Sequence, residues 1–477
     1  MESSSDSDFS DTSESLSDTS QLEDEDEDDE KYADSSKRLE TFHSSNDGID
    51  RISELPDLVL RHILSFLDMK EVIGNTSRIS RRWRNLWISL PFLNFDHSMW
   101  HTKHRFITFI DKVLLRRDDS TIKKLCFCIS CAYCEADRVD DWMILAARKH
   151  VEEVHLDIDM KISKVLPDLI FNSDVQVFKL RTSWFKTKMQ LPKTVCLAPK
   201  LKILEIDGVE LPNGLLNEEL VLSCLSLEIL RIHYCNHKHI RSLHICAPQL
   251  KKLVLENRSI GSNGFCKLQI STSNLKSLVL KGSLYEDYSL ENLTSLECAK
   301  FESSALVDAG IVIKVLEGLH NATALELLGN LKMTFVGCLD ILDQRIHPFV
   351  NLRFLKIDGW SCSSCIPTIH NLLTSSDCLK TLTLGINQVR EAENWRELFQ
   401  CIYCLKSIEI KGLKCCDDEL TFFEFVLKNA VVLEYLTLDF HDCLLLTRKE
   451  ELAEFNMKIH SLPRASSNVK ILPLILT

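Results

Sequence analysis

Four cysteines lie close together near residue 130 of this 477-residue chain, and their spacing could serve metal chemistry. Cys126, Cys128, Cys131 and Cys134 form a C-x-C-x-x-C-x-x-C group, and four thiolates can hold Zn²⁺ tetrahedrally. Structural zinc sites, however, usually draw their ligands in pairs from two separate segments. Strand alternation also places Cys126 and Cys128 on one face, away from the apolar residues beside them. We therefore expect free thiols here, with no metal and no cofactor.

Other residues that could bind a metal or take part in catalysis are scattered along the chain. Cys362 with Cys365, and Cys401 with Cys404, form two pairs about forty residues apart, and we interpret the second as a helical pair facing the core. The sequence has no G-x-S-x-G, G-x-x-x-x-G-K-[ST], H-E-x-x-H or G-x-G-x-x-G motif. The acidic run from Asp417 to Glu419 is interpreted as a solvated turn before a helix. We expect a protein without catalytic activity of its own.

The net charge of −13 is concentrated at one end of the chain. Residues 1–36 hold fifteen Asp or Glu and one Lys, so the other residues sum to about +1. Residues 1–48 have almost no aliphatic content and are expected to be disordered, because burial cannot offset the entropy of ordering them. A nearly neutral body favours neither nucleic acid nor a membrane surface as its partner.

The nineteen cysteines are spread without a secretory framework, and the first residues are polar and acidic. No apolar run approaches the roughly 20 residues of a membrane span. We expect a reducing compartment, cytoplasm or nucleus, in which most cysteines act as small buried hydrophobes.

The segment from Asp50 to Asp96 has the strongest organisation. Pro56 suits the first turn of a helix, and apolar residues recur at i, i+3, i+4 and i+7 behind it. Three short helices of this kind show more apolar surface than they can hide, which predicts a partner; the alternative is a helical cap packed on the next domain. The apolar residues that we select as partner contacts are Leu55, Pro56, Leu60, Ile63, Leu64, Leu67, Val72 and Trp83.

The residue order of this segment resembles a plant-type F-box. The matching runs are Asp50-Arg-Ile-Ser53, Leu55-Pro-Asp57, Ile63-Leu-Ser-Phe-Leu67, Ser80-Arg-Arg-Trp-Arg84, Leu86-Trp87 and Leu90-Pro91, whereas Asp68-Met-Lys70 departs mildly from the usual pattern. The resemblance implies that the segment binds a Skp-type adaptor and, through it, a cullin ubiquitin ligase.

A repeat follows. The template L-x-x-L-x-L begins at thirteen places between Ile122 and Leu433, with a period near 26 residues, and this resembles leucine-rich repeats. Positions four and six should enter a shared core, while the residue between them and the residue after position six should face the open, concave side. The last repeats, with a helix between two strands after Leu405, resemble the FBD module of plant F-box proteins.

The expected fold is α/β: a three-helix F-box followed by an irregular leucine-rich-repeat solenoid, or horseshoe, with a disordered acidic N-terminal tail. The segments that we assign are a tail (1–48), the F-box (49–96), a linker helix (97–120), the repeats (121–384), an FBD-like module (385–460) and a C-terminal tail (461–477).

The open side of the repeats is the expected site for a protein substrate. Its outward positions include a cation-rich strip, and the residues that we select there are Lys179, Arg181, Trp184, Arg231, His233 and Trp360. The alternative is that these residues are ordinary solvated strand residues.

Two functions remain open. The first is a substrate-recognition subunit of a Skp–cullin–F-box ubiquitin ligase with an unknown protein substrate. The second is a repeat scaffold that binds the adaptor without promoting ubiquitination. A small-molecule co-receptor is a further alternative, although no basic cluster suited to an inositol phosphate stands out.

Overall fold

The computed structural model describes residue 52 and residues 54–76, 79, 81–130, 132–133, 136–159, 164–182, 189–213, 218–237, 239–257, 266–282, 285–303, 309–329, 348–360, 372–386, 403–440 and 449–474. The chain divides into two units, Met1–Glu54 and Leu55–Thr477, and the elements below belong to the second. The expected tail over 1–48 lies outside the described residues.

Three short helices open the second unit. They are α2 (Asp57–Leu64), α3 (Met69–Thr76) and α4 (Arg81–Leu86), and the 3-10 turn η2 (Trp87–Ser89) follows them. Pro56 occupies the N-cap of α2 with φ −57°, because a proline there loses no hydrogen bond. The three helices that the sequence predicts are thus present.

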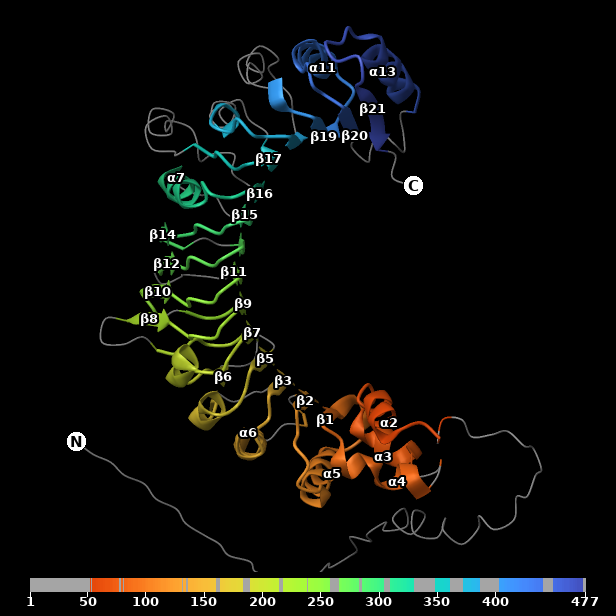
Figure 1. Ribbon diagram of the computed structural model, residues 1–477, viewed down its shortest axis with the longest axis vertical. Coiled ribbons are helices and arrows are strands. Elements are labelled where there is room, and N and C mark those ends of the chain that lie inside the picture. Colours follow the sequence, from red (N-terminus) through yellow and green to blue (C-terminus); the bar gives the residue numbers. More distant parts are fainter. Residues whose placement is uncertain are drawn as a thin grey trace, which may run out of the picture. The chain divides into compact units, whose positions relative to one another are not determined.

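Fifteen strands of the described residues form one parallel sheet, in the order of the chain (Figure 1). They are β1 (Phe92–Asp96), β2 (Lys124–Ile129), β3 (Glu153–Ile158), β5 (Val177–Arg181), β7 (Ile203–Asp207), β9 (Ile229–His233), β11 (Lys252–Asn257), β13 (Ser277–Gly282), β15 (Cys298–Ser303), β16 (Ala324–Gly329), β17 (Phe354–Trp360), β18 (Thr381–Ile386), β19 (Ser407–Leu413), β20 (Tyr435–Phe440) and β21 (Lys470–Leu474). We call this the main sheet.

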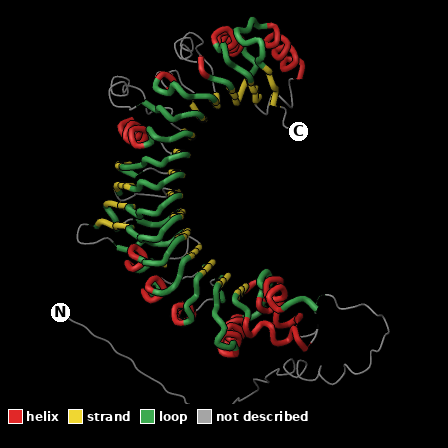
Figure 2. Tube along the Cα trace, in the orientation of Figure 1, coloured by secondary structure: helices red, strands yellow, loops and turns green. Residues whose placement is uncertain are grey.

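The segments between these strands return on the side away from the open face of the main sheet (Figure 2). The helices there are α5 (Lys103–Arg116), α6 (Ala136–Arg148), α7 (Ala309–Gly318), α11 (Asp417–Asn429) and α13 (Lys449–Ser461), and the 3-10 turns are η3 (His97–Met99), η4 (Asp168–Asn172) and η5 (Lys193–Leu197). Four returns pair as a second parallel sheet of β8 (Glu219–Leu222), β10 (Ser242–Ile245), β12 (Lys267–Ser271) and β14 (Asp287–Glu291), while β4 (Lys164–Val165) pairs with β6 (Met189–Gln190).

The core lies between the main sheet and these returns. In β7, for example, Leu204 and Ile206 are buried while Glu205 and Asp207 point outward, as the template predicts. The poorest repeat, after Leu296, still forms β15, because Ala299 and Phe301 fill the two inward positions. Each unit thus contributes two strand side chains to one continuous core.

The main sheet extends one strand beyond the predicted repeats at each end. The sequence assigns residues 461–477 to a tail, whereas Lys470–Leu474 form β21 and pair with β20. At the other end, Phe92–Asp96 lie inside the segment assigned to the F-box but form β1 and pair with β2. The helix expected within 97–120 is present as α5, and it is the return between β1 and β2.

The prediction of a solvated turn at Asp417–Glu419 is wrong. Helix α11 begins at Asp417, and Glu419 is buried at its N3 position. Its carboxylate accepts the backbone N–H groups of Lys414, at 3.0 Å, and of Cys416, at 3.2 Å. Burial raises the pKa of the Glu419 carboxyl, and the backbone N–H groups that it accepts at the start of the helix oppose that shift.

Candidate functional site

Five exposed apolar side chains lie within ten residues on helix α2 and just after it. We call this set the α2 patch; its members are Leu58, Val59, Ile63, Phe66 and Leu67. Leu58 and Phe66 are the most open, with 79% and 74% of their surfaces exposed. The ring of Phe66 makes an edge-to-face contact with His62, with ring centroids 5.1 Å apart. Such a local concentration of exposed apolar surface is typical of an interaction site.

The residues that the sequence selects as partner contacts divide into two groups. Ile63, Leu67 and Pro56 are exposed, and Leu55 is half-buried. Leu60, Leu64, Val72 and Trp83 are instead buried in the chain's own core. A side chain without exposed surface has none to bury against a partner, so these four support the α2 patch from beneath.

The start of α2 is tied to α4. The Arg82 guanidinium donates from Nε to Asp57 Oδ1 at 3.0 Å and from Nη2 to the Leu55 carbonyl at 2.8 Å. Both side chains of the Arg82–Asp57 ion pair are well exposed, so the pair contributes little to stability, and its effect is to orient the helix.

Asp68 connects the helical domain to the first strand of the main sheet. Its Oδ1 accepts the backbone N–H of Lys70 at 2.7 Å and so caps α3, while its Oδ2 accepts the backbone N–H of Asp96 at 2.8 Å. Burial raises the pKa of the Asp68 carboxyl, and these two bonds oppose that shift. Asp68, which departs from the usual F-box pattern, thus has a structural role in linking α3 to β1.

Replacing Asp68 with asparagine should lower the free energy of unfolding by about 1–3 kcal/mol, because an amide has one acceptor oxygen and leaves one of the two N–H groups unpaired. Chemical denaturation measures the change. Asp57→Asn is the control, since the exposed ion pair it disrupts is worth under about 1 kcal/mol. Equal effects of the two substitutions would contradict the bridging role of Asp68.

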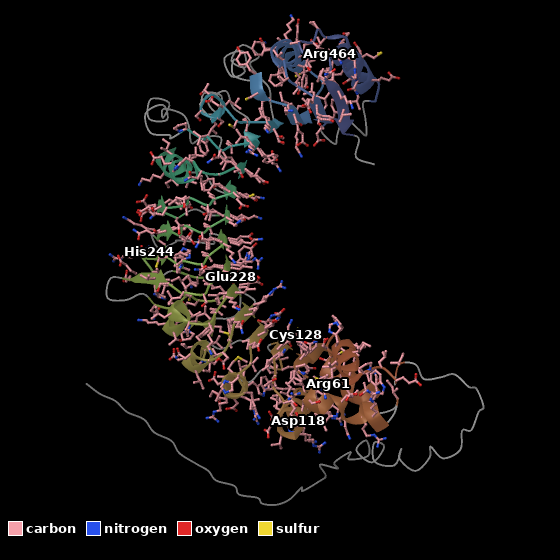
Figure 3. All side chains as sticks on the ribbon, in the orientation of Figure 1. Arg61, Asp118, Cys128, Glu228, His244 and Arg464 are labelled. Carbon is pink, nitrogen blue, oxygen red and sulfur yellow. The ribbon has the colours of Figure 1, made fainter. Side chains whose placement is uncertain are left out.

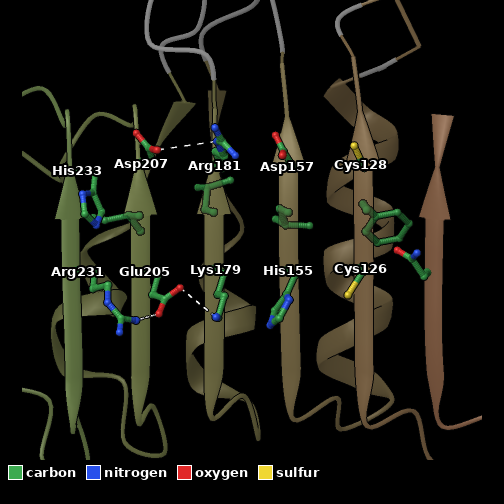
Figure 4. Close-up of a pocket in the computed structure, with 15 residues that line it drawn as sticks. Cys126, Cys128, His155, Asp157, Lys179, Arg181, Glu205, Asp207, Arg231 and His233 are labelled. Carbon is green, nitrogen blue, oxygen red and sulfur yellow. Dashed lines mark ion pairs between the residues drawn. The ribbon is translucent and has the colours of Figure 1, made fainter. Parts of the chain in front are cut away.

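The open face of the main sheet carries two rows of polar side chains (Figure 4). In the first row, Cys126, His155, Lys179, Glu205 and Arg231 lie in register on β2 to β9. In the second row, acidic and basic residues alternate over seven neighbouring strands, and we call them the charge ladder: Asp157, Arg181, Asp207, His233, Glu256, Lys281 and Glu302.

Neighbouring members of these rows form ion pairs. In the first row, Glu205 pairs with Lys179 at 3.0 Å and also with Arg231, so two cations share one carboxylate. In the charge ladder, Arg181 Nε is 3.9 Å from Asp207 Oδ2. The first row therefore has an excess of positive charge around Glu205.

A pocket of about 410 Å³ lies over these rows, on strands β1 to β9. Four of the predicted substrate residues line it, namely Lys179, Arg181, Arg231 and His233. Trp184 lies outside the described residues. Trp360 ends β17, far along the sheet order from the pocket, and its side chain is not described.

The pocket also contains residues outside the set selected from the sequence. Asn94 comes from β1, the strand that the repeat count misses; Leu90-x-x-Leu93-x-Phe95 fits the template and could have revealed it. His155 lies in the first row, where burial, with Lys124 and Lys179 nearby, lowers its pKa to about 4. Its imidazole is therefore neutral near pH 7, and its Nε2 has no hydrogen-bond partner in the described part of the chain.

Cys126 and Cys128 lie on the open face, as predicted from strand alternation, and both have free thiols. Burial, together with the carboxylates of Asp96 and Asp157, raises the pKa of Cys128 to about 11. Cys131, Cys134, Cys362, Cys365 and Cys401 lie outside the described residues, so the packing expected for the Cys401–Cys404 pair remains a prediction.

Comparison with known proteins agrees with this architecture. The F-box domain model matches residues 52–95, and the model for the LRR repeats of FBD-associated F-box protein At5g56370 matches residues 139–261. The putative F-box/FBD/LRR-repeat protein At1g66300 of Arabidopsis thaliana is 25% identical, over 94% of this chain and all of that protein. The F-box/LRR-repeat protein At3g58900 of the same plant is 33% identical, over 52% of this chain and 78% of its own length.

Among solved structures, a leucine-rich-repeat protein of Leptospira interrogans matches 85% of this chain and 98% of its own, at 14% identity and a TM-score of 0.31. Within the described part of the chain, no helix has the length and apolar character to cross a membrane.

A helical domain with an exposed apolar patch, followed by a parallel-strand solenoid, defines a leucine-rich-repeat protein with an F-box. The chain belongs to the family of plant F-box/LRR-repeat proteins. Members of this family are generally non-catalytic, and F-box domains generally bind Skp-type adaptors.

Proposed function

We propose that the chain is the substrate-recognition subunit of a Skp–cullin–F-box ubiquitin ligase. The observation that carries this proposal is the α2 patch, because it leaves apolar surface open to water in a domain that matches the F-box model. A Skp-type adaptor is the partner that would cover this surface, and the cullin would be reached through that adaptor.

The proposed adaptor contact consists of the α2 patch, with Pro56 and the half-buried Leu55 at its edge. The buried residues Leu60, Leu64, Val72 and Trp83 keep the patch in place. Adaptor binding should therefore depend on two separable properties, the exposed side chains themselves and the stability of the core below them.

The proposed substrate contact is the pocket on the open face. Its lining offers Lys179 and Arg231 around one shared carboxylate, and Arg181 with 71% of its side chain exposed. The lining also holds the carboxylates of Asp157 and Asp207, so its three cations and three carboxylates favour a partner segment that presents charges of both signs. The pocket and the α2 patch lie on different elements, so the two partners do not compete for the same residues.

Reversing the charge of Lys179, Arg181 and Arg231 to glutamate should weaken substrate capture by at least about tenfold, equivalent to about 1.4 kcal/mol, and leave adaptor capture unchanged. Affinity capture from plant extract, with purified adaptor added as an internal reference, measures both. The matched control reverses Lys251, Lys276 and Lys406, which pair with neighbouring glutamates but do not line the pocket. Unchanged substrate capture in the first triple variant would place recognition elsewhere.

A reconstituted ligase reaction tests the function itself. Proteins captured by the chain should be ubiquitinated by the complex of chain, adaptor and cullin, but not when Phe66 is replaced with aspartate. If captured partners remain unmodified in the wild-type reaction although the adaptor is bound, the chain acts as a scaffold, and the ligase proposal is refuted.

A further inference from the structure

Three side chains with different donor atoms meet where the main sheet begins. They are Asp96 at the end of β1, His97 at the start of η3 and Cys128 on β2, and each is half-buried. One ligand atom from each residue lies within 4.8 Å of the others. A carboxylate oxygen, an imidazole nitrogen and a thiolate are the donor types of zinc sites in proteins.

The backbone holds these residues in place. Asp96 and Cys128 are register partners on adjacent parallel strands. The Asp96 carboxylate accepts the backbone N–H of Ser98 at 2.8 Å, which fixes the turn that carries His97. His97 Nδ1 lies 3.0 Å from the Cys128 carbonyl oxygen, and its ring contacts Tyr133 with centroids 5.2 Å apart. Nδ1 also lies 3.7 Å from an Asp96 carboxylate oxygen, and because it donates to the carbonyl, Nε2 would be the nitrogen that binds a metal.

The charges around the thiol also suit a dication. Cys128 has Asp96 as its register partner on one side and Asp157 on the other, so its sulfur lies between two carboxylates. A bound dication would take the place of the thiol proton and reduce the repulsion between the two acids. The sulfur and nitrogen donors favour Zn²⁺ over Mg²⁺ or Ca²⁺, which prefer oxygen alone.

We propose that Asp96, His97 and Cys128 bind one Zn²⁺ at the rim of the open-face pocket. Three protein ligands leave the fourth tetrahedral position for Asp157, for water or for a side chain of a bound partner. Cys128, which Figure 3 labels, lines the pocket (Figure 4), so the metal would join the first two strands and present a Lewis acid to an occupant. This proposal is independent of the ligase function.

The site differs from the zinc site that the sequence analysis considered and rejected. That site used Cys128 with Cys126, Cys131 and Cys134, whereas the present one uses Cys128 with residues about thirty positions upstream. Any test must therefore separate the two sets of ligands.

The test uses the full-length chain purified without chelator. Elemental analysis should find about one zinc per chain, and titration of the stripped protein with ZnCl₂ against a chromophoric chelator measures affinity. Cys128→Ser, His97→Gln and Asp96→Asn should each weaken binding by at least about 100-fold, since changes to residues behind metal ligands already cost about 10–100-fold. Cys126→Ser is the matched control for metal binding, because it removes a half-buried thiol from the same face of β2 and should leave the zinc affinity unchanged.

Cobalt substitution gives a second readout. Co²⁺ added to the stripped protein should produce a thiolate-to-metal absorption band that Cys128→Ser removes and Cys126→Ser retains. A melting curve of each metal-free variant confirms that it folds, and Asp96→Asn keeps an oxygen that can accept the Ser98 N–H.

Three results would overturn the proposal. The first is a stripped wild-type chain that binds no zinc. The second is zinc retained at full affinity in Cys128→Ser. The third is zinc lost in a Cys131→Ser, Cys134→Ser double variant but kept in His97→Gln and Asp96→Asn, which would identify the four-cysteine group as the site.

Discussion

Replacing Phe66 with aspartate should reduce the affinity for a Skp-type adaptor by at least about a thousandfold. The phenyl ring is 74% exposed in the free chain, and burying such a side chain stabilises a complex by roughly 1.5–3 kcal/mol. An aspartate there would also bring a carboxylate into a dry interface, at a cost of several kcal/mol. Because each 1.4 kcal/mol is about a factor of ten, the two effects together exceed three decades.

Calorimetry with purified adaptor measures this effect, and a melting curve shows whether the variant is folded. Leu115→Asp is the matched control, since Leu115 on α5 is 84% exposed but lies outside the α2 patch. The control should bind the adaptor normally. Phe66→Asp with unchanged affinity would mean that the α2 patch is not the adaptor contact.

Leu64→Asp should have an equally large effect by a different route. Leu64 is only 2% exposed and packs inside the helical domain. Placing a carboxylate there removes a buried leucine and buries a charge without a partner, which together should cost at least about 4 kcal/mol. We expect helices α2 to α4 to lose protection in hydrogen exchange, while β5 to β20 keep theirs.

Leu58→Asp is the control for that experiment, because it introduces the same carboxylate in the same helix at a position that is 79% exposed. It should leave hydrogen exchange unchanged and affect only adaptor binding. If Leu64→Asp leaves α2 protected, the packing described for this helix is wrong.

The Phe66→Asp and Leu64→Asp experiments depend on a point at which the structure of helices α2 to α4 differs from the prediction made from the sequence. The sequence places Leu60, Ile63, Leu64 and Leu67 on one face, which assumes a continuous helix. Helix α2 ends at Leu64, so Leu67 follows a turn and lies outside that periodicity. Leu60 and Leu64, four residues apart, share the inward face, whereas Ile63 is rotated outward. Periodicity identifies an apolar face, but not which part of it the chain covers itself.

The solenoid was easier to predict than its ends. At each of the thirteen predicted places, positions four and six are apolar and a strand forms with these two side chains directed inward. The final strand β21 escapes the template, since Asn468 stands at position one and Pro473 at position six. The repeat count misses the first strand, β1, because its residues also continue the F-box pattern.

Prediction of the candidate sites from the sequence is likewise limited to what local patterns show. Strand alternation correctly places Lys179, Arg181 and Arg231 on the open face, because that inference needs only local geometry. The bridge from Asp68 to Asp96 and the group of Asp96, His97 and Cys128 join residues about thirty positions apart. No local pattern indicates such meetings. The first depends on how the start of α3 lies against β1, and the second on the register of β1 and β2.

The charge ladder restricts how the number of repeats can change. Its residues stand one strand apart, about 4.8 Å, and every acid has a base beside it. Deleting the single unit that carries Arg181 would place Asp157 next to Asp207, and like charges on neighbouring strands are destabilising. Deleting two adjacent units would restore the alternation. In this part of the molecule, a change by an even number of units therefore keeps opposite charges side by side, whereas a change by one unit does not, so the array has a parity as well as a length.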